Sequence, residues 1–145
     1  MAVLLIYATK TGATAQCIKV LAEEIPDCAI CDIQSDKPSI GDFDSIILGA
    51  GVRDGKIYKP IRDFIKKNHA ELLLKKMGYF ICNEKAKETG EIITRNIPAD
   101  LKEAAVCIES FGGYKAYAAP KEGTDPLKGI FVDRIKAFSS HFAKQ

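Results

Sequence analysis

The amino-acid sequence predicts an α/β fold, in which a parallel sheet is covered by helices on both faces. Short apolar runs rich in β-branched residues recur along the 145-residue chain, as they do in strands buried on both faces. Segments in which apolar residues have helical spacing separate these runs. Strands that alternate with helices form right-handed βαβ units, which place helices on both sides of a parallel sheet.

Five runs are predicted strands, because each is short and continuously apolar. They span residues 2–7, 29–33, 45–49, 78–82 and 105–111. Four helices are predicted between and after them, at residues 15–25, 60–68, part of 91–103, and about 126–142. Pro60 suits a first helical turn, whereas Pro98 is expected to break or restart the third helix.

Length and composition favour a single globular domain over residues 1–145. Hydrophobic residues make up 47% and charged residues 28% of the chain, which is ordinary for a globular protein. The net charge of +2 comes without a large cluster, so nucleic acid is not an expected partner. The longest apolar run, at residues 2–8, is far shorter than a membrane-spanning helix and follows no basic residue. We therefore expect no membrane span and a cytoplasmic location.

The chain contains five cysteines, and most lie in apolar runs where a thiol packs as a small hydrophobic group. We therefore expect reduced thiols. Cys28 and Cys31 form a C-x-x-C pair, but in a strand their side chains would point to opposite faces. That geometry argues against a zinc site or a reactive dithiol, so no metal site is predicted.

The loop after the first predicted strand combines residue types that bind phosphate. Its threonines supply hydroxyl donors, and Gly12 allows a tight turn before a helix N-terminus. Neither the nucleotide P-loop motif nor the dinucleotide fingerprint is present there. A helix N-cap by Thr11 or Thr14 is the alternative, but three hydroxyls in six residues exceed what one cap requires. The predicted phosphate contacts are Thr9, Lys10, Thr11, Gly12, Ala13 and Thr14.

These residues, T-K-T-G-A-T, match the phosphate motif of flavodoxin-type FMN domains, and the sequence resembles that family along its whole length. The resemblance implies a flavodoxin-like three-layer sandwich around a five-stranded parallel sheet in the order 2-1-3-4-5. It also implies FMN as the cofactor, with its phosphate at residues 9–14 and its isoalloxazine held by the loops after strands three and four.

The second loop is similar to one branch of that family, the menaquinone-dependent protoporphyrinogen oxidases. The match is G-A-x-[IV]-R-x-G at residues 49–55, together with the basic Lys10, and Asp54 stands where an aromatic residue is expected. Tyr58 and Tyr114 are the candidates for aromatic cover of the ring. The other predicted ring contacts are Gly51, Val52, Arg53, Gly55, Lys56, Asn83, Glu84, Lys85, Gly112 and Gly113.

Basic residues in the predicted cofactor loops indicate a flavin potential above that of low-potential carriers, because a nearby cation stabilises the anionic reduced flavin. Electron-carrying flavodoxins, by contrast, usually present an acidic surface there. The basic residues are Lys10, Arg53, Lys56, Lys85 and Lys87.

The resemblance implies an FMN-binding oxidoreductase or electron-transfer protein, and the sequence leaves open whether it is an enzyme. Its partner would be a redox protein or a small electron donor or acceptor, such as a quinone, a porphyrinogen or a nicotinamide. No separate catalytic acid or base is predicted, and the oligomeric state is open. A phosphorylation receiver on the same fold needs acidic residues where this chain has Ala8, Gly49 and Ala50. A cofactor-free flavodoxin-like binding module is the alternative.

Overall fold

Five parallel strands form the central sheet of the computed structural model, which describes residues 3–9, 12–83, 86–112, 127 and 129–144. Their lateral order is β2-β1-β3-β5-β6, which is the predicted order 2-1-3-4-5 when only the parallel strands are counted. The predicted fold class and sheet order are therefore confirmed. The strands are β1 (Val3–Ala8), β2 (Cys28–Asp32), β3 (Ser45–Arg53), β5 (Lys76–Cys82) and β6 (Cys107–Ser110).

A short sixth strand turns the second predicted loop into a hairpin. Strand β4 (Lys56–Ile57) pairs antiparallel with the end of β3, and Asp54 and Gly55 join the two strands. Both turn residues have positive φ, 54° and 76°, as a type I′ turn requires, and Asp-Gly is among the pairs that this turn favours. The predicted strand end at residue 49 was therefore wrong: β3 runs on to Arg53.

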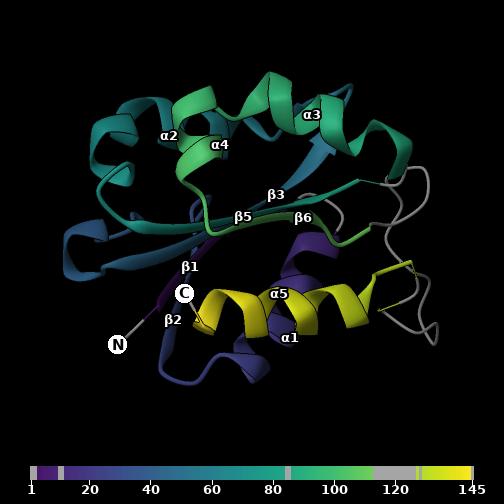
Figure 1. The fold of residues 1–145 in the computed structure, drawn as a ribbon, viewed down its shortest axis with the longest axis horizontal. Coiled ribbons are helices and arrows are strands. Elements are labelled where there is room, and N and C mark those ends of the chain that lie inside the picture. Colours follow the sequence, from purple (N-terminus) through teal and green to yellow (C-terminus); the bar gives the residue numbers. More distant parts are fainter. Residues whose placement is uncertain (1–2, 10–11, 84–85, 113–126, 128, 145) are drawn as a thin grey trace.

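Helices cover both faces of the sheet and complete three layers (Figure 1). On one face lie α1 (Ala13–Glu24) and α5 (Val132–Lys144). On the other face lie α2 (Lys59–Leu72), α3 (Thr89–Asn96) and α4 (Ala99–Ala104), and short 3₁₀ turns occupy η1 (Ile40–Asp42) and η2 (Ala86–Glu88). Pro98 caps α4, so the third predicted helix is interrupted at this proline as expected.

The sheet separates two apolar clusters, one under each helical layer. Leu5 and Phe80 face the α1 and α5 side, whereas their neighbours Leu4 and Tyr79 face the opposite side. Because successive strand residues point to opposite faces, burial of both faces explains the uninterrupted apolar runs in the sequence. In the same way Cys28 packs on one cluster and Cys31 on the other, as predicted for this pair.

No helix in the described part of the chain is long and apolar enough to cross a membrane. Within those same residues, no group of three or more His, Cys, Asp or Glu side chains could hold a metal ion.

Close packing at the end of β3 leaves no room for a side chain at Gly51. A Cβ atom there would lie 2.7 Å from ring atoms of Tyr58. We expect Gly51→Ala to lower the free energy of unfolding by about 1–3 kcal/mol, since the ring or the strand must shift. Urea denaturation measures the change. The matched control is Gly41→Ala in η1, where a Cβ meets no atom within 4 Å and the expected change is below about 0.5 kcal/mol. Equal effects at the two glycines would contradict this explanation.

Candidate functional site

The carboxyl ends of parallel strands meet at one edge of the sheet, and most predicted site residues lie there. β1, β5 and β6 lead directly into such residues, and β3 leads into the hairpin. The structure places Thr9, Gly12, Ala13, Thr14, Gly51, Val52, Arg53, Gly55, Lys56, Tyr58, Asn83 and Gly112. The other predicted contacts, Lys10, Thr11, Glu84, Lys85, Gly113 and Tyr114, lie outside the described residues.

The predicted phosphate loop ends in a sharp turn at Gly12. This glycine is the N-cap of α1 and has φ of 94°, a conformation that residues with a side chain rarely adopt. Its amide donates to the hydroxyl oxygen of Thr9 over 3.0 Å, and the Thr9 amide donates to Oε1 of Gln34 over 3.0 Å. Thr9 and Gln34 therefore set the shape of the loop.

The N-terminus of α1 presents positive charge that no acidic residue of its own first turn balances. No acidic residue occupies its first turn, and the N-cap makes no side-chain hydrogen bond. The first amides of a helix lack carbonyl partners within it, and the helix dipole adds partial positive charge there. Thr14 lies inside this first turn with 1% of its surface exposed, and its hydroxyl makes no hydrogen bond to any described residue. The N-cap alternative for Thr14 is therefore wrong, and the turn suits an oxyanion.

The hairpin at the end of β3 is held by a side chain from the end of α3. Nδ2 of Asn96 donates to the Gly55 carbonyl over 2.9 Å and to the Ile92 carbonyl over 2.8 Å. The Ile57 amide in turn donates to Oδ1 of Asn96 over 3.2 Å. Helix α3 therefore fixes the position of the turn that carries the predicted ring contacts.

The two faces of the hairpin differ in exposure. Val52 and Tyr58 are buried, at 6% and 7% exposure, and belong to the apolar cluster on the α2 side. Arg53 and Lys56 are exposed to solvent. Tyr58 packs against Gly51, so stacking of this tyrosine on a flavin stays a prediction.

A buried polar network joins the carboxyl ends of β5 and β6. The Ser110 hydroxyl donates to Oδ1 of Asn83 over 2.6 Å, and Nδ2 of Asn83 donates to the Thr89 hydroxyl over 3.3 Å. The Gly112 amide donates to the Ser110 hydroxyl oxygen over 3.3 Å. These bonds fix the backbone of both strand ends at the edge where the site lies.

Two buried thiols connect α1 to the end of β5. The Sγ atoms of Cys17 and Cys82 lie 3.5 Å apart, and all five cysteines are free thiols. The hydrogen bond that Cys17 shares with Cys82, together with burial, raises the pKa of Cys17 above its usual range. Cys17 therefore stays protonated at neutral pH and packs as a hydrophobic group.

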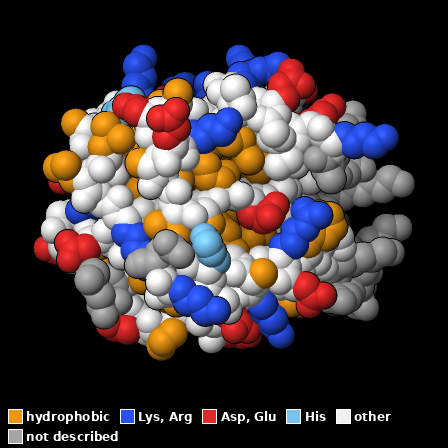
Figure 2. Space-filling view, in the orientation of Figure 1, with side chains coloured by type: hydrophobic (Ala, Val, Ile, Leu, Met, Phe, Trp, Pro, Cys, Tyr) orange, Lys and Arg blue, Asp and Glu red, His pale blue; other side chains and the backbone are white. Residues whose placement is uncertain are grey.

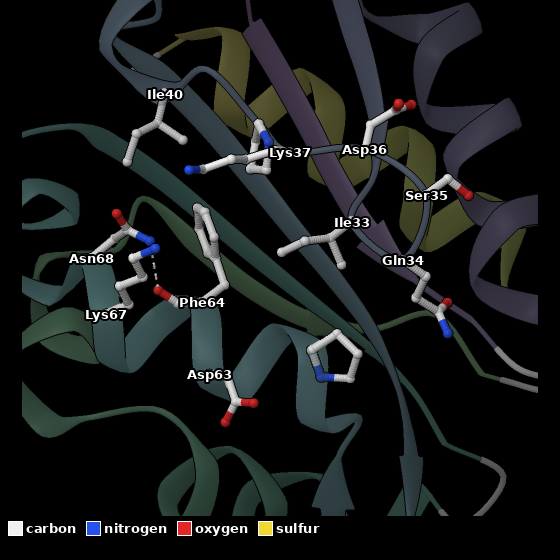
Figure 3. A pocket seen from close by; sticks show the side chains of 12 residues that line it. Ile33, Gln34, Ser35, Asp36, Lys37, Ile40, Asp63, Phe64, Lys67 and Asn68 are labelled. Atoms are coloured by element: carbon white, nitrogen blue, oxygen red, sulfur yellow. Dashed lines mark hydrogen bonds between the residues drawn. The ribbon is translucent and has the colours of Figure 1, made fainter.

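A pocket of about 430 Å³ lies beside the phosphate loop, between the segment after β2 and helix α2 (Figure 3). Ile33, Ile40 and Phe64 point into it and form its apolar walls (Figure 3). Gln34, which accepts from the Thr9 amide, also lines this pocket, so the pocket adjoins the phosphate loop. The charged residues of its lining are balanced in sign, namely Asp36, Asp63, Lys37 and Lys67.

Sequence reasoning missed three residues that shape this site. Ser110 had a local signal, because it is a lone hydroxyl residue near the end of an apolar run. Gln34 and Asn96 had none, because each reaches a partner far away in the sequence. The Asp54–Gly55 pair carried a recognisable hairpin signal that was not used.

A family model described as the flavodoxin domain matches residues 4–119. The chain belongs to this family. The predicted resemblance to flavodoxin domains is therefore confirmed, and the strand-edge site described above lies within a flavodoxin domain.

Relatives of this flavodoxin domain include two longer proteins named protoporphyrinogen IX dehydrogenase (quinone). The protein of Leishmania major is 25% identical over 91 residues, which cover 59% of this chain and 39% of that protein. The protein of Escherichia coli K12 is 24% identical over 93 residues, which cover 61% of this chain and 51% of that protein. The chain thus matches about half or less of the length of these relatives.

Solved structures share the fold of this flavodoxin domain. A flavodoxin of Fusobacterium nucleatum, whose crystal structure is described as bound to flavin mononucleotide, has a TM-score of 0.62 at 12% sequence identity. That comparison covers 99% of this chain and 97% of the other. At this level of identity the likeness concerns the fold.

The hydrogen bonds of Asn96 give a test of how the hairpin is held. We expect Asn96→Ala to lower the free energy of unfolding by about 1–3 kcal/mol, because polar groups of the hairpin lose their partner. Amide hydrogen exchange of Ile57 should also become faster, and both changes are measurable on purified protein. The control is Thr94→Ala on the same helix, where an exposed hydroxyl accepts from Lys102 and the expected change is below about 0.5 kcal/mol. Unchanged exchange at Ile57 would contradict the assignment.

Proposed function

We propose that this flavodoxin domain binds FMN and transfers electrons between the flavin and a separate donor or acceptor. The observation that carries the proposal is the N-terminus of α1, where the buried residue Thr14 lies in a first turn lacking acidic residues and its hydroxyl has no described hydrogen-bond partner. A dianionic phosphate ester supplies the acceptors that this turn lacks. Family membership and the FMN-bound flavodoxin of similar fold support the same cofactor.

The residues of the phosphate loop would have separate roles. The Thr14 hydroxyl and the free amides of the first helical turn would donate to phosphate oxygens. The Thr9 hydroxyl oxygen accepts from the Gly12 amide, which leaves its own hydrogen available for a phosphate oxygen. Lys10 and Thr11 complete the proposed set.

The hairpin and the ends of β5 and β6 would hold the isoalloxazine. FMN, when bound, supplies one- and two-electron transfer, whereas the protein supplies anchoring, orientation and local charge. Asn96 fixes the hairpin, and the Asn83–Ser110 network fixes the facing strand ends, so both sides of the proposed ring site are preorganised. Proposed contacts from the remaining strand ends are Gly51, Val52, Gly112, Gly113 and Tyr114.

The electron donor and acceptor are proposed at the level of chemical class. A quinone is one candidate, because the relatives of this chain are named for a quinone-linked dehydrogenase. A protein redox partner is the other candidate, because flavodoxin-like proteins transfer electrons to partners and this chain belongs to that family. Porphyrinogen oxidation would be one form of this quinone-linked reaction.

Replacing the Thr14 hydroxyl tests the phosphate site directly. We expect Thr14→Val to weaken FMN binding about tenfold, the loss expected for one hydrogen bond to a charged group. Quenching of FMN fluorescence during titration measures the dissociation constant. Riboflavin, which has no phosphate, should bind the wild type and this variant equally.

A control variant keeps the Thr14 test specific. Thr94→Val changes an exposed threonine on α3 and should leave FMN affinity unchanged. If the wild-type chain takes up no FMN at all, the proposal is wrong, and the cofactor-free binding module is favoured.

Basic residues on the hairpin should raise the flavin potential. We expect Arg53→Gln to lower the potential of the second electron by tens of millivolts at most, since Arg53 is exposed and water screens its charge. Spectroelectrochemical titration measures the shift, which should shrink as salt is added. Lys19→Gln, an exposed change on α1, is the control. An equal shift in both variants would show that total charge, and not the hairpin, sets the potential.

A further inference from the structure

A second pocket, of about 310 Å³, lies behind the hairpin, between α2 and the C-terminal end of α3. Five of its lining side chains are basic or can become so, and no acidic side chain is among its described lining residues. Ile65 and Pro98 add apolar surface. We call this the basic pocket, and its lining residues are Lys56, Arg62, Ile65, Lys66, His69, Arg95, Asn96 and Pro98.

Two of these side chains already have acidic partners at the rim. Nη2 of Arg95 lies 2.6 Å from Oε1 of Glu91, and Nε2 of His69 lies 2.7 Å from Oδ2 of Asp100. The hydrogen bond from His69 lowers the pKa of Asp100, so that carboxylate stays ionised beside the imidazole. These partners account for two of the five groups.

The other three cations have no acidic partner among the described residues. Lys56 and Lys66 are exposed and form no ion pair there. Arg62 is half-buried, and its Nε donates to the Ile57 carbonyl over 2.9 Å. That bond leaves both terminal Nη groups available, in the fork geometry that pairs with a carboxylate.

The concentration of charge in the basic pocket contrasts with the rest of the chain, whose net charge is only +2. Along the upper edge of the molecule, over the helices of the α2 and α3 layer, Lys and Arg side chains are visible with Asp and Glu side chains among them (Figure 2). Like charges in a concave site repel one another and raise the local positive potential. An anion that binds there relieves this repulsion, so the pocket favours a ligand with several negative charges.

We propose that the basic pocket binds a group of two or three closely spaced carboxylates. Arg62 would hold one carboxylate through its two Nη groups, and Lys56 and Lys66 would reach the others on flexible stems. The volume of about 310 Å³ is at the small end of ligand pockets and is enough for a molecule of the size of citrate. Acidic side chains on one segment of a partner protein present the same chemistry.

The basic pocket is structurally linked to the hairpin but separate from the phosphate loop. Arg62 bonds to the Ile57 carbonyl, and Asn96 in the pocket wall bonds to the Gly55 carbonyl. A ligand in the pocket would therefore contact the residues that position the hairpin. The phosphate loop leads into α1 on the other face of the sheet (Figure 1). The proposal does not depend on FMN binding.

Two-dimensional ¹H–¹⁵N NMR with added citrate tests the proposal on the intact chain in about 20 mM salt. We expect shift changes at the amides of Lys56, Arg62 and Lys66, with an affinity that falls as salt is added. Changes at Gly12 and Thr14 would report binding at the phosphate loop and are fitted separately.

Three variants test whether citrate binds in the basic pocket. We expect Lys66→Gln to weaken citrate binding about threefold and Arg62→Gln about tenfold, because the arginine loses a bidentate pair. Arg62→Gln can also disturb the hairpin, because Arg62 bonds to the Ile57 carbonyl. Lys66 is exposed, so Lys66→Gln tests the pocket without that effect. Lys19→Gln on α1 removes the same charge on the other face of the sheet and should leave the affinity unchanged.

A hexaglutamate peptide in a parallel titration distinguishes the two sources of carboxylates. Tighter binding of the peptide than of citrate assigns the pocket to an acidic protein segment, and tighter binding of citrate assigns it to a small polycarboxylate. Either result supports the carboxylate site. The proposal is overturned if neither probe shifts the pocket amides at about 10 mM, or if Lys19→Gln weakens binding as much as Lys66→Gln.

Discussion

Burial of both faces of the parallel sheet is the constraint on which the rest of this structure depends. Strands covered on each side by helices are largely apolar, so little polar chemistry lies within their middles. Polar groups therefore collect where the strands end, and parallel strands end at the same edge. Thr9 follows β1, Asn83 follows β5 and Gly112 lies just after β6, which brings three distant segments to one place.

Polar contacts between distant segments give that edge its shape. Gln34 bonds to the phosphate loop, Asn96 to the hairpin, and Ser110 to the end of β5. Each of these contacts satisfies backbone or buried polar groups that would otherwise lack partners, which makes them costly to lose. The position of the hairpin is thereby coupled to α3, an element on the far side of β5 in the sequence.

The local distribution of charge, more than the net charge of the protein, indicates which ligands these regions favour. The first turn of α1 has no acidic residue, and three cations of the basic pocket have no described acidic partner. The two regions lie on opposite faces of the sheet. The hairpin follows α1 in the chain, carries the exposed Arg53, and contributes the exposed Lys56 to the basic pocket. Both regions favour anionic ligands, for different physical reasons: helix amides in one case and side-chain cations in the other.

The sequence by itself determined the fold class, because apolar runs show which strands are buried on both faces. The strand order followed from the resemblance to flavodoxin domains that T-K-T-G-A-T carries. Phosphate binding by this loop, where hydroxyls and a glycine stand beside a helix start, stays a prediction. The sequence also predicted the second loop as part of the site, but the hairpin that its Asp-Gly pair indicates was not predicted.

Only the tertiary structure decided which side chains hold the loops and which cations share a pocket. Asn96 reaches Gly55 across 41 positions, and the cations of the basic pocket come from β4, α2 and α3. Such neighbours arise from how helices pack on the sheet, and no local pattern of residues records that packing. Periodicity reports which face of an element is buried, whereas the partner across the interface depends on the arrangement of the whole chain.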